Sequence, residues 1–340
     1  MTPEEKLQLI KRNSKEIITE QELLKLLKTK KKPTIYLGTA ITQRPHIGYF
    51  VWIQKLSDFL KCGFKVKVLL ADLHGALDNT PWDVLDLRYK YYNQVIPLMF
   101  KSIGVNIKDL ELIKGSSFQL QKKYFQDVLK MSTQVSIHDC KKAGSEVVKQ
   151  LENPKISGLV YPIMQSIDEE YLKADIQYGG VDQRKILMFA RENLPKLNYK
   201  PRIEFMTPLI PGLTSKKMSA SNPKSKIDLL DTENDVITKV NSAFCESGVI
   251  EDNGILAFLK HVIMPIKEDN KIQFIIDRQE KYGGNLKIKT YNQLESLFTK
   301  KIIHPLDLKK ATAKEINNLL KTFKSKNSEL EKLAKKAKMQ

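Results

Sequence analysis

The chain has 340 residues, of which 41% are hydrophobic and 28% charged, a composition typical of a soluble globular protein. No stretch approaches the ~20 apolar residues of a membrane span, and the N-terminus lacks the apolar block of a signal peptide. The three cysteines are scattered and form no Cys/His cluster, which fits a reducing cytosol and predicts no zinc site. The formal net charge of +18 favours polyanionic partners, although the lysine-rich residues 300–340 can equally form a solvated face.

Predicted helices and strands alternate over the first two thirds of the chain. An amphipathic helix is predicted over residues 15–29, where Thr19 and Glu22 fit a capping box. Strands are predicted over residues 34–39, 64–73, 110–115, 174–180 and 202–207, and helices over residues 49–63, 83–103, stretches up to about 152, and 181–194. This alternation favours an α/β fold with a doubly wound parallel sheet.

After about residue 226 the patterns become almost entirely helical. Helices are predicted over residues 231–244, 253–263, 290–301 and 305–324. Turn and linker residues in SASNPKSK place a domain boundary near residues 222–230. We therefore expect a helical N-terminal segment over residues 1–33, an α/β domain over 34–222, and a helical domain with a basic tail over 223–340.

The segment TAITQRPHIGYF, residues 39–50, begins where the first predicted strand of the sheet ends. Ligands of open α/β sheets bind beyond the carboxyl ends of the strands. Gly38 would let a ligand approach the backbone, and the helix after His46 and Gly48 would offer free N–H groups to a phosphate. Taken alone, however, the segment is better explained as an ordinary surface loop with one histidine.

The segment YPIMQSIDEEYL, residues 161–172, is predicted to be a helix with a polar face. Tyr161, Gln165 and Asp168 fall at i, i+4 and i+7, whereas the apolar residues form a different face. Such a line of hydrogen-bonding groups beside a core face suits recognition of a small polar ligand. The alternative is a helix side that simply faces solvent.

Two further segments carry groups that can bind a nucleotide. In YGGVDQRK, residues 178–185, Asp182 can bind a ribose hydroxyl or can cap the next helix. GLTSKKMSASNPKSK, residues 212–226, is basic and rich in hydroxyls, so Lys216 and Lys217 can reach a polyphosphate, but a linker would look similar. No serine–histidine–acid signature, P-loop or metal cluster stands out, which favours chemistry by positioning and charge neutralisation.

Two motifs together are more specific than any single segment. PHIGY at the first strand–helix turn and KMSAS, residues 217–221, after the last strand of the sheet resemble the HIGH and KMSKS signatures of class I aminoacyl-tRNA synthetases. IYLGTA, LLADLHGALDN, YPIMQSIDEEYL, GGVDQRKI and IIHPLDLK resemble tyrosyl-tRNA synthetases of the eukaryotic and archaeal type. The resemblance covers residues 15–324 and implies a Rossmann-like catalytic domain followed by an α-helical anticodon-binding domain.

The resemblance assigns roles residue by residue. For L-tyrosine it implies phenol contacts from Tyr36 and Asp168, α-amino contacts from Tyr161, Gln165 and Gln183, and a pocket wall at His74. For ATP it implies binding by Gly38, His46, Gly48, Asp182 and Lys217, with His46, Gly48, Lys217 and Ser219 in catalysis. For tRNA it implies an anticodon base at Tyr282 and Asp307 and a contact near the acceptor end from Arg184. A plain turn at Tyr282 and an acidic first helical turn at Asp307 are the ordinary alternatives.

The same resemblance implies a reaction and partners. L-tyrosine and ATP would give tyrosyl-adenylate and pyrophosphate, after which the tyrosyl group passes to the 3′ end of tRNA(Tyr). Mg²⁺ would accompany ATP, although no metal-ligand motif is visible. We also expect a cytoplasmic homodimer, formed through a helical region at about residues 110–150 and without membrane attachment. The basic tail, residues 325–340, is a candidate for additional tRNA affinity.

Two departures from the family pattern keep other functions open. Tyr49 stands at the second histidine of HIGH, and Ala220 stands at the second lysine of KMSKS. A synthetase-like RNA-binding protein without catalysis is therefore one alternative, and another adenylyl transferase with a histidine–glycine turn is a second. A tryptophanyl enzyme is the third, but Tyr36 and Asp168 argue against it because indole has one donor and no acceptor.

Overall fold

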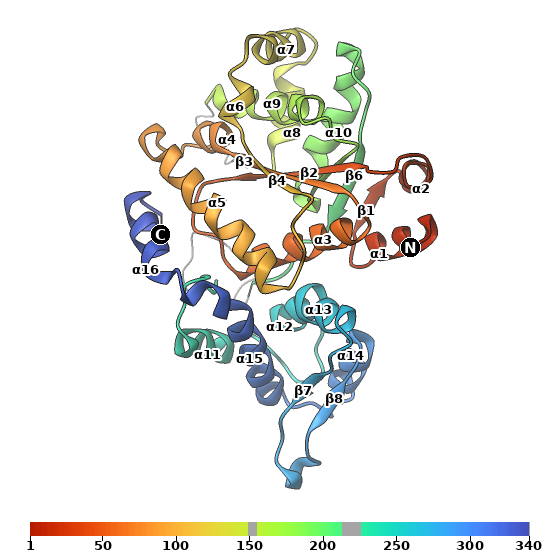
Figure 1. Cartoon of the computed structure of the whole chain (residues 1–340), viewed down its shortest axis with the longest axis vertical. Helices are drawn as coiled ribbons and strands as arrows, with labels where there is room; N and C mark the ends of the chain where they lie inside the picture. The colour runs from red at the N-terminus through yellow and green to blue at the C-terminus, as the bar shows by residue number, and fades with distance from the viewer. Residues whose placement is uncertain (149–154, 213–225, 340) are drawn as a thin grey trace.

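A computed structural model describes residues 1–148, 155–212 and 226–339 of the chain. A six-stranded sheet in the order β1-β6-β5-β2-β3-β4 forms its centre, with helices on both faces and a mostly helical C-terminal part beyond one of them (Figure 1). The strands of this sheet are β1 (Glu16–Ile18), β2 (Thr34–Ala40), β3 (Lys65–Ala71), β4 (Leu110–Lys114), β5 (Ile176–Gly180) and β6 (Ile203–Thr207). All adjacent pairs are parallel except β1 with β6.

The strand order places a topological switch at the centre of the sheet. From β2 the chain proceeds outward through β3 to β4, and it then returns to the other side of β2 for β5 and β6. The connections after β2 and β5 therefore diverge, which leaves a crevice at their carboxyl ends. The fold class expected from the sequence is confirmed.

Helices cover the two faces of the sheet unequally. The face drawn upward in Figure 1 carries α4 (Asp72–Leu77), α6 (Ser116–Gln119), α7 (Lys122–Ser132), α8 (Ile137–Gly144), α9 (Ser157–Tyr171) and α10 (Arg184–Asn193). The opposite face carries α1 (Pro3–Lys11), α3 (Phe50–Lys61) and α5 (Leu85–Ser102), while α2 (Glu20–Thr29) lies beside the β1 edge. On α3, Phe50, Ile53, Leu56 and Phe59 recur at helical spacing and are fully buried, so this helix is held against the sheet by apolar burial.

The C-terminal part contains more than helices. Its elements are α11 (Glu233–Ser242), α12 (Gly254–Phe258), a π-helical turn (Leu259–Ile263), α13 (Met264–Asp269), β7 (Phe274–Ile276), β8 (Leu286–Ile288), α14 (Tyr291–Thr299), α15 (Pro305–Lys324) and α16 (Asn327–Lys336). β7 and β8 pair antiparallel and project from the helices as a hairpin (Figure 1). The helices predicted from the sequence are present here, but this hairpin was missed, because three-residue strands are too short to show an alternating pattern.

Two further predictions need correction. Residues 16–18 are not the start of a helix: they form β1, paired with β6, and α2 begins only after its N-cap Thr19, whose hydroxyl accepts from the Glu22 N–H. α1 precedes both elements. The strand predicted over residues 64–73 ends at Ala71, where α4 begins. Pairing along the sheet edge thus overrides the local helical pattern of residues 16–18. Among the described residues no helix is both long and apolar enough to cross a membrane.

Candidate active site

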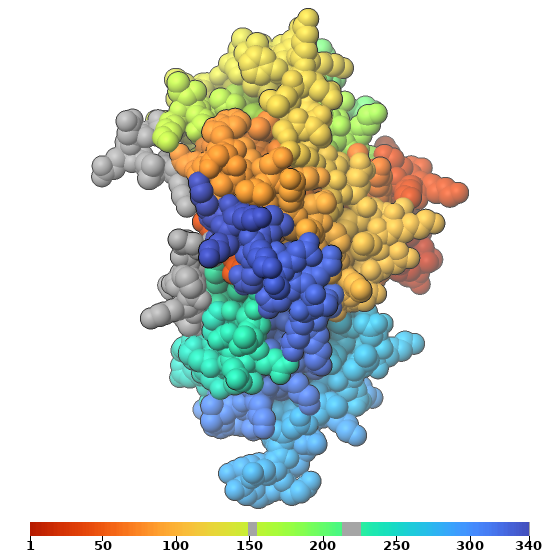
Figure 2. Space-filling view, turned by 60° about the vertical axis from the view of Figure 1, so that its left-hand side comes forward, coloured from red at the N-terminus to blue at the C-terminus, as the bar shows by residue number. Residues whose placement is uncertain are grey.

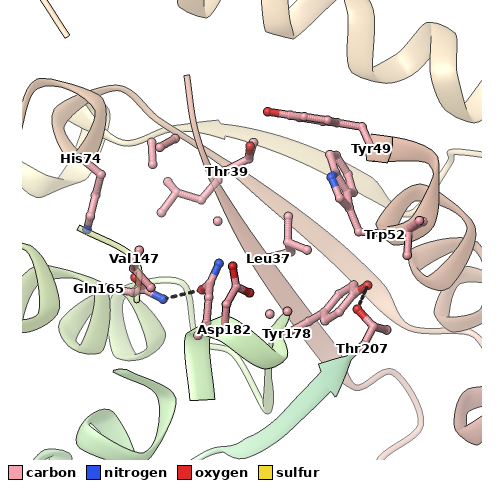
Figure 3. A pocket seen from close by; sticks show the side chains of 18 of the residues that line it. Leu37, Thr39, Tyr49, Trp52, His74, Val147, Gln165, Tyr178, Asp182 and Thr207 are labelled. Carbon is pink, nitrogen blue, oxygen red and sulfur yellow. Dashed lines mark hydrogen bonds between the residues drawn. The ribbon is translucent and has the colours of Figure 1, made fainter. Parts of the chain in front are cut away.

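A cavity of about 640 Å³ opens at the carboxyl ends of β2 and β5, at the topological switch of the sheet (Figure 3). Its walls come from the end of β2, the turn that follows it, α4, α9 and the turn after β5. The residues expected from the sequence to bind L-tyrosine and ATP that the structure describes all line it: Tyr36, Gly38, His46, Gly48, His74, Tyr161, Gln165, Asp168, Asp182 and Gln183. Segments far apart in sequence therefore meet in one site.

Tyr36 lies on the central strand, fully buried. Its phenol oxygen accepts a 3.0 Å hydrogen bond from Nε2 of Gln177, which is its register partner on β5. The hydroxyl of Tyr36 also lies 3.4 Å from the backbone carbonyl of Gln165, which is a long contact for an O–H donor. Burial and the nearby Asp168 raise the pKa of Tyr36 far above its usual value, so the hydroxyl keeps its proton and can donate it.

Asp168 lies on α9, and it is fully buried. Nε2 of Gln119 donates to its two carboxylate oxygens at 2.8 and 3.0 Å, and the hydroxyl of Tyr124 donates to Oδ1 at 2.8 Å. These hydrogen bonds favour the ionised carboxylate, but burial outweighs them and raises the pKa of Asp168 to about 7. The site therefore holds a carboxyl group that is close to its titration midpoint at neutral pH.

The helical face predicted over residues 161–172 is present in the structure. Tyr161, Gln165 and Asp168 line the cavity, while Ile163, Met164 and Ile167 pack in a separate apolar cluster with α7 and α8 residues. Nε2 of Gln165 donates to Oε1 of Gln183 at 3.0 Å, which links α9 to the turn after β5 (Figure 3). This hydrogen bond fixes the amide side chains of Gln165 and Gln183 in the cavity that the buried Tyr36 and Asp168 also line.

His74 closes the cavity from α4 and is neutral. Its ring stands edge-on to that of Tyr161, with centroids 4.6 Å apart. Its Nε2 lies 3.8 Å from Oδ2 of Asp168, too far for a hydrogen bond. Burial lowers the pKa of His74 to about 4, so this contact is not an ion pair at neutral pH. His74 thus shapes the wall beside Asp168 without adding charge to it.

The turn after β2 presents His46 in one tautomer. Nδ1 of His46 accepts a 3.1 Å hydrogen bond from the Gly48 N–H, and burial lowers the pKa of the ring to about 4. A neutral ring that accepts at Nδ1 carries its proton on Nε2, which leaves one N–H donor. The turn is also tied to the segment after residue 225, because His46 forms a β-bridge with Asp228 and the Ile47 N–H donates to the Ile227 carbonyl at 3.0 Å.

Tyr49, at the position where the family pattern has its second histidine, supports this turn with its ring. Its ring meets that of His46 edge-on at 5.4 Å and lies 5.6 Å from the ring of Trp52. Its hydroxyl lies 3.2 Å from that of Tyr92 on α5. Tyr49 therefore lines the cavity as an aromatic support for His46.

The turn after β5 requires its glycines. A Cβ atom added to Gly180 would collide with the carboxylate of Asp182, and one added to Gly179 would lie 3.2 Å from the Gln183 side chain. A Cβ atom at either position would force the neighbouring polar side chain to shift from its present place. Asp182 and Gln183 are therefore placed at the cavity by the Gly-Gly sequence itself.

Three expected site residues that the structure describes do not line this cavity. Arg184 is half exposed, and its guanidinium bonds the carboxylate of Glu16 at 2.7 and 3.0 Å. Tyr282 is 62% exposed near the tip of the β7–β8 hairpin, and Asp307 is in the first turn of α15. Lys217 and Ser219, together with the rest of KMSAS, lie outside the described residues.

Three buried polar residues of the site were missed in the sequence. Gln119 and Tyr124 hold Asp168, and Gln177 holds Tyr36. Gln177 is in a strand whose other residues are apolar or glycine, so a polar residue inside a central strand was an available signal. Gln119 and Tyr124 carry no such signal, because they reach Asp168 from a different part of the chain.

The described residues contain no group of three or more His, Cys, Asp or Glu side chains that could hold a metal ion. A resident metal site therefore does not fit the part of the cavity that the structure describes. A metal ion that enters as a complex with a phosphate-bearing substrate would take its ligands from that substrate.

Comparisons with known proteins identify the family of this chain. A family model described as tRNA synthetases class I (W and Y) matches residues 28–321. The cytoplasmic tyrosine–tRNA ligase of Xenopus tropicalis is 50% identical over 99% of this chain and 64% of its own length, and that of Saccharomyces cerevisiae is 46% identical over 98% and 88%. This chain thus spans less than two thirds of the Xenopus protein.

A solved structure is also similar throughout. The tyrosyl-tRNA synthetase of Archaeoglobus fulgidus in complex with L-tyrosine superposes with a TM-score of 0.87 and 35% identity over 98% of this chain and 99% of that one. The sheet order, the cavity at its switch point and these relationships lead to one conclusion: the chain belongs to the class I tRNA synthetases of the tryptophan and tyrosine group, in the eukaryotic and archaeal tyrosyl branch.

Proposed function

We propose that this chain is a tyrosine–tRNA ligase, which activates L-tyrosine with ATP and transfers it to tRNA(Tyr). The observation that carries the proposal is the pair of buried oxygens from Tyr36 and Asp168 in the cavity. A phenol can donate to the carboxylate and accept from the Tyr36 hydroxyl, so it satisfies both groups. Phenylalanine would offer no acceptor to the Tyr36 hydroxyl and no donor to the Asp168 carboxylate, and losing both hydrogen bonds is costly in a buried site.

The remaining polar groups of the cavity suit the rest of the amino acid and ATP. Tyr161, Gln165 and Gln183 would bind the α-amino group. The His46 Nε2–H and the backbone at Gly48 would contact the ATP phosphates, Gly38 would let the nucleotide approach β2 closely, and Asp182 would bind its ribose. Lys217 and Ser219, outside the described residues, would complete the phosphate site as the family pattern implies.

The reaction follows from positioning these two substrates. The carboxylate of L-tyrosine attacks the α-phosphorus of ATP, the bond to the β-phosphate oxygen breaks, and pyrophosphate leaves. The neutral His46 donates a hydrogen bond where negative charge develops, without giving up its proton. In the second step a ribose hydroxyl at the 3′ end of the tRNA attacks the tyrosyl carbonyl and releases AMP. Mg²⁺ would enter with ATP as part of the substrate.

The C-terminal part is proposed to bind tRNA. The exposed Tyr282 can stack on an unpaired anticodon base, and Asp307 can accept a hydrogen bond from a base edge. Arg184, which follows the cavity residue Gln183 in the sequence and is half exposed, would contact the acceptor end. The lysine-rich residues 300–340 supply positive charge for the phosphate backbone.

A homodimer through residues 110–150 is supported by exposed apolar side chains. Leu120, Phe125, Leu129 and Ile137 are 71%, 59%, 53% and 66% exposed. They lie on and beside α7 and α8, and Phe125 and Leu129 are one helical turn apart. Apolar groups gathered in this way mark an association surface, and we propose a second copy of this chain as its occupant. A cytoplasmic location is proposed from the names of the relatives.

One assay tests the function and separates the alternatives. ATP–pyrophosphate exchange is measured with L-tyrosine, L-phenylalanine and L-tryptophan, followed by charging of tRNA(Tyr). Exchange with tyrosine alone, together with charging, is the expected result. Exchange with tryptophan would instead identify a tryptophanyl enzyme, and binding of tRNA without any exchange would identify the RNA-binding protein that Tyr49 and Ala220 leave conceivable.

A further inference from the structure

The C-terminal helix α16 is packed against the α/β domain. Leu330, Ala334, Ala337 and Met339 are buried, and α16 contacts α5. The end of the chain accordingly lies on the surface of residues 50–100 (Figure 2). The sequence predicts a tRNA-binding tail in these lysine-rich residues, but their apolar face is buried against the rest of the chain.

Arg88 on α5 joins this C-terminal segment to the loop that leads into the His46 turn. Its side chain is 4% exposed. Nε and Nη2 donate to the carbonyls of Ala337 and Lys338 at 3.2 and 3.3 Å, while Nη1 donates to the carbonyls of Thr42 and, at 3.5 Å, Ile41. A buried guanidinium must satisfy its donors, so Arg88 fixes both backbone segments relative to α5.

A second tie connects the same two segments. Arg44, two residues after Thr42, has a side chain only 15% exposed, and its Nη2 lies 2.6 Å from a carboxylate oxygen of Glu331 on α16. Its Nη1 lies 3.8 Å from Asp228, whose backbone forms the bridge with His46. Between these arginine contacts, the hydroxyl of Tyr92 donates to the carbonyl of Gln43. Every residue from 41 to 44 is therefore held from α5 or α16.

We propose that the C-terminal segment, residues 327–339, positions the ATP-phosphate turn, with Arg88 and Arg44 as the positioning residues. The inference rests on the proposed function, because it assigns a role in ATP binding to contacts that do not touch ATP. Its physical basis is that residues 41–44 connect the end of β2 to His46, with residues 41–43 anchored through their backbone carbonyls and Arg44 through its side chain. Without anchors on those carbonyls, the Nε2–H of His46 would sample more positions and bind the phosphates less well.

The tyrosine pocket does not share these anchors. Tyr36 and Asp168 are held by Gln177, Gln119 and Tyr124, which belong to β5, α6 and α7. A general loss of stability would weaken the binding of both ATP and tyrosine. Loss of a tRNA-binding tail would weaken the binding of neither. The proposal predicts a third pattern, in which binding of ATP weakens and binding of tyrosine does not.

The test uses two variants that break the hydrogen bonds between Arg88 and the C-terminal segment, one by removing the acceptors and one by changing the donor. A chain that stops after Lys336 lacks the carbonyls of Ala337 and Lys338, and Arg88→Lys keeps the charge but loses the planar fork. We expect the ATP KM in pyrophosphate exchange to rise about tenfold in both, with the tyrosine Kd from calorimetry within about twofold. Amide exchange of residues 41–44 should become faster.

The controls keep the inference separate from the proposed function. Lys332→Gln changes charge on the exposed side of α16 and should leave the ATP KM unchanged, and Glu331→Gln should give a smaller rise than Arg88→Lys. An unchanged ATP KM with unchanged amide exchange would overturn the proposal, as would equal losses of ATP and tyrosine binding. If the unmodified chain performs no exchange with any amino acid, the proposed function fails, while amide exchange still decides whether the anchor holds the loop.

Discussion

Gln177 donates to the phenol oxygen of Tyr36 at 3.0 Å, and this contact determines which way the Tyr36 hydroxyl can point its proton. The oxygen is already an acceptor, so the proton must go to another acceptor. Within the protein the hydroxyl can donate to the Gln165 carbonyl at 3.4 Å, a weak partner. A ligand oxygen in the cavity can take its place, which makes Tyr36 a donor to the substrate phenol and leaves Asp168 as the acceptor.

Removing the Tyr36 hydroxyl tests this arrangement. In Tyr36→Phe, kcat/KM for tyrosine in pyrophosphate exchange should fall about 10- to 100-fold, because a buried hydrogen bond is lost and the substrate oxygen is left without a donor. The ratio of kcat/KM for tyrosine to kcat/KM for phenylalanine should decrease. Tyr199→Phe is the matched control, since that hydroxyl bonds Asp127 away from the cavity. Equal kinetics in wild type and Tyr36→Phe would show that Tyr36 does not contact the phenol.

Asp168 should make tyrosine binding pH-dependent. Its pKa is raised by burial to about 7, and the ionised form is the stronger acceptor for a phenol. Tyrosine affinity measured by calorimetry should therefore increase as the pH rises from 6 to 8. Asp168→Asn should bind more weakly and lose this dependence. A wild-type affinity that is flat over this range would contradict the assignment.

The same group gives a prediction for stability, with the sign set by the raised pKa. The native Asp168 carboxyl holds its proton up to about pH 7, whereas the unfolded one releases it near 3.8. Its contribution to stability is present at low pH and lost as the pH rises through 7. Glu169 and Glu204 also have pKa values raised by burial, so only a difference is informative. The free energy of unfolding of Asp168→Asn, relative to that of wild type, should increase as the pH is raised from 5 to 8. Urea denaturation at each pH measures this difference.

How much the sequence can predict depends on where the partner of each residue lies. Tyr161, Gln165 and Asp168 share a helical face that periodicity alone identifies, and their placement in one cavity follows from the strand order. The support for Asp168 was not predictable, because Gln119 and Tyr124 reach it from other helices. Arg88 was missed because a charged residue in a predicted helix suggests solvent, whereas its partners are backbone carbonyls in two distant segments, at residues 41–42 and 337–338.

Tyr49 should act through its ring more than through its hydroxyl. Tyr49→Phe loses the 3.2 Å contact with the Tyr92 hydroxyl and a hydrogen bond with Thr39, each worth about 1 kcal/mol. Tyr49→Ala also removes the edge-on support of the His46 ring. We expect the ATP KM of Tyr49→Phe to stay within about threefold of wild type and that of Tyr49→Ala to rise by about tenfold or more. A larger rise in the ATP KM for Tyr49→Phe than for Tyr49→Ala would mean that Tyr49 acts through its hydroxyl.

The exposed face of α7 should hold the homodimer together. Phe125→Glu places a charge among Leu120, Leu129 and Ile137, so burying this face in a second copy would require desolvating an unpaired carboxylate. Sedimentation velocity should show a monomer for Phe125→Glu. Lys123→Glu, on an already exposed and charged position of the same helix, should remain dimeric. If Phe125→Glu has the same sedimentation coefficient as wild type, the interface lies elsewhere.

Tyr282 should contribute to tRNA binding through its ring face. It is 62% exposed near the tip of the β7–β8 hairpin, where an aromatic ring has no core to stabilise and is available for a base. Stacking on one base contributes about 1–3 kcal/mol, so Tyr282→Ala should raise the tRNA KM in the charging assay by about tenfold. Pyrophosphate exchange, which needs no tRNA, should not change. Tyr282→Phe keeps the stacking surface and should behave like wild type. A loss in Tyr282→Phe equal to that in Tyr282→Ala would indicate a hydrogen bond from the hydroxyl instead, and no loss in either would exclude Tyr282 from the tRNA contact.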